Sequence, residues 1–103
     1  MNNKTTNNIK SSINPFENID FKSGIVTHIE NDFSQEYLRE DMLQVIYPKD
    51  YLLDVGWYRT NFTVLIIKNC DWENPITVVH SDILNLHKTV ICAVEMIEKM
   101  IIK

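Results

Sequence analysis

Three polar residues in the first third of the chain have the spacing of a metal site. His28, Glu30 and Asp32 alternate, and on a β-strand this spacing places three potential ligands on one side. The residues after Ile29 resemble a turn, so an exposed polar edge is the simpler interpretation. A small metal-dependent hydrolase built on these three residues stays open as an alternative.

Other catalytic arrangements are hard to find in the sequence. Cys70 stands beside Asp71 without a nearby histidine, and Cys92 falls in the apolar stripe of an expected helix. His80 and His87 would lie about 10 Å apart along a helix, too far for one metal ion. Two glycines cannot build a phosphate-binding loop, and no GxSxG or HExxH motif occurs. We therefore predict no catalytic residue, no bound metal and no cofactor.

Acidic residues are concentrated in one part of the chain. The net charge of the 103 residues is −4, but the stretch from Glu17 to Asp54 alone carries nine acids and three bases. This balance disfavours nucleic acid as a partner, because phosphate binding needs clustered lysine and arginine. It predicts either a solvated face or a surface that receives a basic partner.

Three dense apolar runs between Met42 and Pro75 predict a β-meander. They span residues 43–47, 51–58 and 62–67, are rich in β-branched and aromatic residues, and are separated by short polar breaks. The third run is apolar on both faces, which predicts an interior strand and a sheet that needs cover on both sides.

A long helix is predicted at the C-terminal end. Ser81 is expected to cap it, Asp82 to lie in its first turn, and apolar residues recur every three or four positions as far as Ile101. Residues 24–32 are a strand candidate, and residues 76–79 form either a short strand or an extended lead into the helix.

The predicted fold class is α+β. It comprises an antiparallel β-meander of three to five strands packed against the long C-terminal helix, with a short helix at residues 33–41 before the meander. Residues 1–12 are predicted to be a flexible tail and residues 13–103 a single domain. No apolar run is long enough to span a membrane and the N-terminus does not resemble a signal peptide, so we expect a cytoplasmic protein with free thiols.

A resemblance adds a functional expectation. The residues YLLDVGWY at Tyr51–Tyr58, the apolar run Phe62–Lys68 and DWENP at Asp71–Pro75 are similar to small bacterial immunity proteins of contact-dependent growth inhibition and related polymorphic toxin systems. The resemblance covers about a third of the chain, from Leu43 to Pro75. It implies that Asp54, Gly56 and Trp57 maintain the fold, with Gly56 allowing a bulge or a close backbone approach.

The resemblance also implies a binding function without catalysis. Such proteins remain in the cytosol and bind one cognate toxin domain, the C-terminal part of a large surface-delivered effector. Many of these toxins are nucleases, whose phosphate-binding sites are basic. An acidic partner fits such a surface, and we expect a 1:1 complex, most readily with an RNase. The family's toxin contacts tend to vary, so none is transferred to this chain.

The residues expected to contact the toxin are acidic or aromatic. They are Glu30, Asp32, Glu36, Glu40, Asp41, Tyr58, Trp72 and Glu73.

A homo-oligomeric adaptor that associates through a free sheet edge or the long helix remains an alternative function. A homodimer is also compatible with toxin binding.

Overall fold

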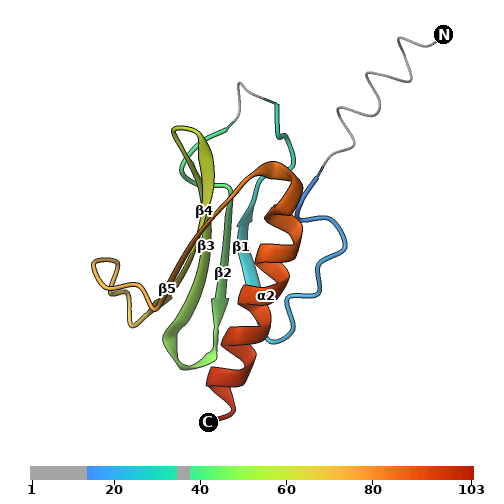
Figure 1. The fold of residues 1–103 in the computed structure, drawn as a ribbon. Coiled ribbons are helices and arrows are strands. Elements are labelled where there is room, and N and C mark those ends of the chain that lie inside the picture. The colour runs from blue at the N-terminus through green and yellow to red at the C-terminus, as the bar shows by residue number, and fades with distance from the viewer. Residues whose placement is uncertain (1–13, 35–37) are drawn as a thin grey trace, which may run out of the picture.

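The computed structural model describes residues 14–34 and 38–103. Five strands form one antiparallel sheet in the order β1-β2-β3-β4-β5, and one long helix lies against it (Figure 1). The predicted α+β meander with a C-terminal helix is confirmed, and both strand candidates outside the central meander join the sheet. The elements are β1 (Ile25–Ile29), β2 (Leu43–Tyr47), η2 (Pro48–Asp50), β3 (Tyr51–Tyr58), β4 (Asn61–Lys68), β5 (Thr77–Ser81) and α2 (Ile83–Ile101).

The short helix expected before the meander is reduced to a turn. Within residues 33–41, those that the structure describes are not helical, and residues 35–37 lie outside the described part of the chain. The Asp32 carboxylate accepts a hydrogen bond from the Ser34 backbone N–H at 2.9 Å, which favours a local turn there. The short helical element described before α2 is the 3-10 turn η2, between β2 and β3. The expected tail at residues 1–12 also lies outside the described residues.

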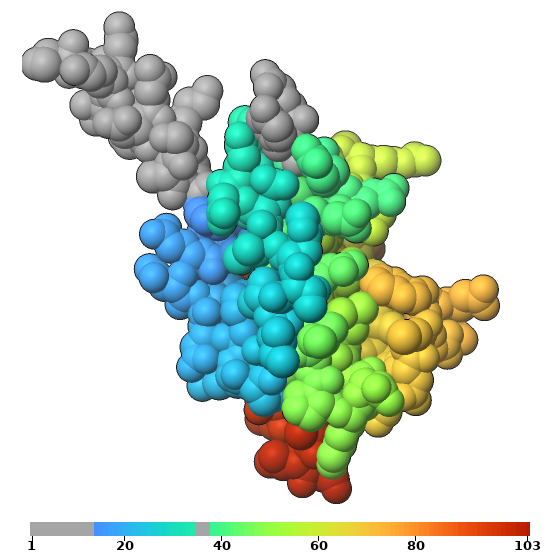
Figure 2. All heavy atoms as spheres, turned by 180° about the vertical axis from the view of Figure 1, so that it is seen from behind, coloured from blue at the N-terminus to red at the C-terminus, as the bar shows by residue number. Residues whose placement is uncertain are grey.

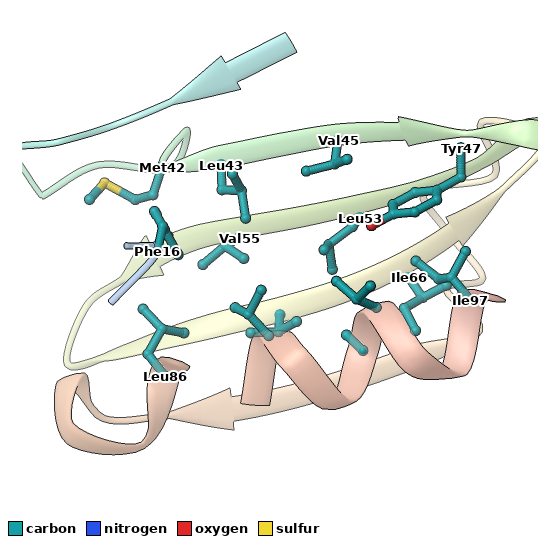
Figure 3. Packing of buried hydrophobic residues seen from close by; sticks show 14 of the residues in the cluster. Phe16, Met42, Leu43, Val45, Tyr47, Leu53, Val55, Ile66, Leu86 and Ile97 are labelled. Atoms are coloured by element: carbon teal, nitrogen blue, oxygen red, sulfur yellow. The ribbon is translucent and has the colours of Figure 1, made fainter. Parts of the chain in front are cut away.

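The hydrophobic core lies between α2 and one face of the sheet (Figure 3). The strand register aligns Leu43, Val55 and Val64 across three strands, and Val45, Leu53 and Ile66 in the next row. These side chains share a face because residues two apart on a strand point the same way. The buried residues of α2 that complete the core are Leu86, Val90, Ala93, Val94 and Ile97.

The segment before β1 closes one side of this core. Phe16 is buried, and its ring meets the Phe33 ring edge to face at a centroid distance of 5.2 Å. Farther along, the Ser23 backbone N–H and hydroxyl both donate to the Glu98 carboxylate of α2. The Ser23 contacts join this segment to the helix, and the Phe16 contact joins it to the residues after β1.

Two details of α2 differ from expectation. The N-cap is Asp82, whose side chain accepts the Asn85 backbone N–H at 2.9 Å, whereas Ser81 is the last residue of β5. The carboxylate takes the capping position because Ser81 is held in the sheet opposite Phe62. Cys92 is exposed and not part of the apolar stripe. It lines a shallow apolar groove between β5 and α2 with Val79 and Met96 among others.

The other face of the sheet, which we call the open face, has no helical cover among the described residues. Seen from behind, the molecule presents the strands between the segment before β1 (blue) and the region of the β4–β5 loop (orange), and α2 (red) emerges only at the bottom edge (Figure 2). Among the described residues, a helix therefore covers one face alone, although Asp54, Thr63 and Ile67 on the open face are also buried.

Candidate interaction surface

The open face divides into an apolar half and a polar half along the strands. Ile25, Ile46, Leu52 and Ile67 stand opposite one another on four successive strands and form a continuous apolar row. We define the apolar half as this row together with Leu65 and Val78, which pair on β4 and β5. The polar half consists of His28, Gln44, Asp54, Tyr58, Thr63 and His80.

A bulge beside the polar half exposes two acidic residues. The Met42 N–H donates to the Val55 carbonyl at 2.9 Å, and the Trp57 N–H donates to the Arg39 carbonyl at 2.8 Å. Two residues, Glu40 and Asp41, therefore stand opposite a single residue of β3, which defines a β-bulge. Both are exposed. The bulge turns them outward at the end of the sheet.

The single residue opposite this bulge is Gly56. A Cβ placed on it would lie 2.3 Å from the Glu40 carbonyl oxygen and 2.8 Å from Cε2 of the Tyr58 ring. Only a glycine therefore allows the bulge and the tyrosine to pack where they do. The close approach expected at Gly56 is confirmed, although the bulge itself lies on the facing segment.

Tyr58 is 38% exposed and borders the acidic residues. Its pKa is raised, first by burial and then by the negative charges of Asp54, Glu40 and Asp41. A cation brought to this place would meet several negative charges and an aromatic ring.

Asp54 is the buried carboxyl of the open face, at 2% exposure. Gln44 Nε2 donates to Asp54 Oδ1 at 3.0 Å. Burial raises the pKa of Asp54, while the hydrogen bond from Gln44 lowers it; Asp41 raises it further and His28 opposes that effect. Gln44 on the neighbouring strand thus supplies a hydrogen bond to a carboxyl that is buried in the middle of an apolar strand.

Four of the expected toxin-binding acids come together at one end of the sheet. The Glu30 N–H donates to the Met42 carbonyl at 2.8 Å, and the Asp32 N–H donates to the Glu30 carboxylate at 3.3 Å. His28 Nε2 contacts the Asp41 carbonyl oxygen at 2.8 Å. Glu30 and Asp32 thus lie beside the bulge that carries Glu40 and Asp41. We call these four acids and Tyr58 the acidic end.

The remaining expected residues are elsewhere. Trp72 and Glu73 lie in the β4–β5 loop, beyond Lys68, which pairs with the first residue of β3. Tyr58 is the last residue of that eight-residue strand, so the two places are separated by about 23 Å of strand. Trp72 is 47% exposed. Glu36 is outside the described residues.

A metal centre is not apparent in the part of the chain that the structure describes. No three histidine, cysteine or acidic side chains there are arranged to hold an ion. His28 contacts a backbone carbonyl, and Glu30 lies past the end of β1. The hydrolase alternative therefore has no described site to support it.

The apolar half of the open face and the bulge at Glu40 and Asp41 were not expected from the sequence. The apolar half depends on which face α2 covers, and the bulge depends on hydrogen bonds between distant segments. One sequence signal was available: Asp54 and Gly56 alternate with Leu53 and Val55. A helix is expected to cover the face without the carboxylate, because an unpaired buried charge is costly.

Comparisons with protein-family models, with curated proteins and with solved structures gave no match. No helix in the described residues is long and apolar enough to cross a bilayer. The resemblance to immunity proteins, based on residues 43–75, therefore stays a prediction.

Proposed function

We propose that this chain is an immunity protein that binds a basic toxin domain in the cytoplasm and neutralises it without catalysis. The toxin domain is the C-terminal part of a large surface-delivered effector, bound 1:1, and an RNase is the favoured activity. The observation that carries the proposal is the acidic end, where two separate chain segments bring Glu30, Asp32, Glu40 and Asp41 together beside Tyr58.

The charge balance at this end supports a basic partner. The bases nearby in the chain are Arg39, before the bulge, and Arg59, in the β3–β4 turn. Four acids outnumber them, and the nearby Asp54 carboxyl adds to the negative field around Tyr58. A nuclease surface that binds phosphates is complementary to this field, which would accelerate association at low salt.

The first experiment identifies the partner and measures its association rate. The tagged chain is used to capture proteins from its native cells, and the basic domain recovered with it is then produced separately. Glu40→Lys/Asp41→Lys is expected to lower the low-salt association rate constant by about tenfold or more. The rates of wild type and variant should converge at high salt, because screening removes the steering effect.

A matched control changes the same charge elsewhere. Glu17 and Glu95 are exposed and lie outside the acidic end, so Glu17→Lys/Glu95→Lys alters net charge by the same amount. An equal fall in association rate for both pairs would mean that only net charge matters and would contradict an acidic binding surface. The wild-type chain should also abolish the domain's nuclease activity at equimolar concentration.

A further inference from the structure

The apolar half of the open face carries exposed aliphatic side chains on its outer strands, whereas Ile67 at its centre is buried. Ile25 is 64% exposed, Ile46 46% and Val78 48%. Ile25 and Ile46 are neighbours on β1 and β2, and Val78 lies on the same face at β5, with Leu52, Leu65 and the buried Ile67 between them. Exposed aliphatic side chains that share one face of a small protein commonly mark an interaction site.

This surface continues into the acidic end. Ile46 and Gln44 are two residues apart on β2, so the apolar row and the polar row beside it are about 7 Å apart. His28 and Asp54 share that polar row, and His28 contacts the backbone of the bulge. A partner footprint of ordinary size, about 800 Å² on each side, would reach from one half to the other.

A second copy of the chain fits this face less well. Two copies packed face to face are related by an axis in the plane of the interface. If the axis runs along the strands, the two acidic ends face each other and repel. If the axis runs across the strands at the apolar row, the two acidic ends lie at opposite ends of the dimer. The two copies then share only the contact between their apolar halves. A basic partner avoids both problems.

We infer that the apolar half anchors an apolar patch of the same basic domain that the acidic end attracts. This inference rests on the proposed function and adds the chemistry of the partner surface, namely aliphatic or aromatic side chains adjoining a cationic region. The acidic end governs association, and burial of Ile46 and Val78 against the partner governs dissociation.

The test uses the basic domain recovered with the wild-type chain and measures both rate constants. Ile46→Asp is expected to increase the dissociation rate constant by about tenfold or more while leaving low-salt association within about threefold. Ile46→Thr and Val78→Thr keep the branched shape that suits a strand and should give smaller increases. Leu84→Asp is the matched control, because Leu84 is 83% exposed on α2, away from the open face.

The outcomes separate this inference from the proposed function. If the wild-type chain binds the domain and all three open-face variants dissociate at the wild-type rate, the inference is wrong and the proposed function stands. If the wild-type chain binds no basic domain, both are overturned. If light scattering finds wild-type dimers that Ile46→Asp converts to monomers, a second copy occupies the face and the inference is again overturned. Thermal unfolding of each variant verifies that it is folded.

Discussion

Gly56→Ala should destabilise the protein through one backbone contact. The added Cβ would lie 2.3 Å from the Glu40 carbonyl oxygen, an atom that cannot rotate away. Overpacking of this kind costs about 1–3 kcal/mol, and a rigid backbone obstacle places the cost near the upper end. Gly56 does not have a positive φ, so alanine recovers about 0.4–1 kcal/mol by restricting the unfolded chain. The net loss expected is about 2 kcal/mol.

Thermal unfolding followed by circular dichroism measures this loss. For a domain of about 100 residues, 2 kcal/mol corresponds to a fall of roughly 8–16 °C in Tm. A second variant, Gly56→Ala/Tyr58→Ala, removes the other close contact, which is with the tyrosine ring. Because the carbonyl contact remains, the double variant should be no more stable than Gly56→Ala.

Two results would refute this reasoning. A Tm of Gly56→Ala within about 2 °C of the wild type would show that the bulge tolerates a side chain there. Recovery of stability in the double variant would show that the Tyr58 ring, and not the Glu40 carbonyl, is the obstacle.

Two further predictions concern buried polar groups. Burial raises the pKa of Asp54 in the folded protein above its value in the unfolded chain. The stability that the Asp54 carboxyl contributes is therefore fully present below the unfolded pKa. It is lost as the pH rises through the folded pKa, because the carboxylate must then be buried with its charge. Asp54→Asn can still accept the Gln44 amide and should be more stable than the wild type at pH 7, with a smaller advantage near pH 4 in urea unfolding. A stability difference that does not depend on pH would contradict this. The Tyr47 hydroxyl is buried without a hydrogen-bond partner in the described residues, and its pKa is raised mainly by burial. Tyr47→Phe should therefore raise the free energy of unfolding by about 1 kcal/mol, and a loss of similar size would reveal a partner for that hydroxyl.

The fold was accessible from the sequence because its signals are local. Alternation of apolar residues in Tyr51–Tyr58 and a three-to-four-residue apolar period as far as Ile101 define a strand and a helix without knowledge of their neighbours. The helix cap was placed one residue early because Ser81 and Asp82 are both good caps. Pairing of β5 with β4 decides between them, and that pairing is not local.

The candidate site was less accessible because it depends on register. Glu40 and Asp41 look like any exposed pair in the sequence, and only the bonds from Met42 and Trp57 to distant carbonyls reveal the bulge. Likewise, the apolar residues of β2 and β3 alone do not indicate which face the helix leaves open. Asp54 could have indicated it, since the helix covers the face that lacks this carboxyl.

If the chain binds a basic domain as proposed, the open face gives it a source of affinity after charge has brought the two together. Full burial of a valine or isoleucine side chain is worth about 2–3 kcal/mol. Ile25, Ile46 and Val78 remain 64%, 46% and 48% exposed, so roughly 4 kcal/mol of that free energy is unrealised in the free chain. If all of it were realised on binding, it would correspond to about a thousandfold in Kd, an upper limit because ordering of the interface offsets part of it. Salt would leave this contribution largely unchanged, because it comes from apolar burial, whereas salt would weaken the attraction of the acidic end. If the two halves act together as proposed, raising the salt concentration should slow association of the complex much more than it speeds dissociation.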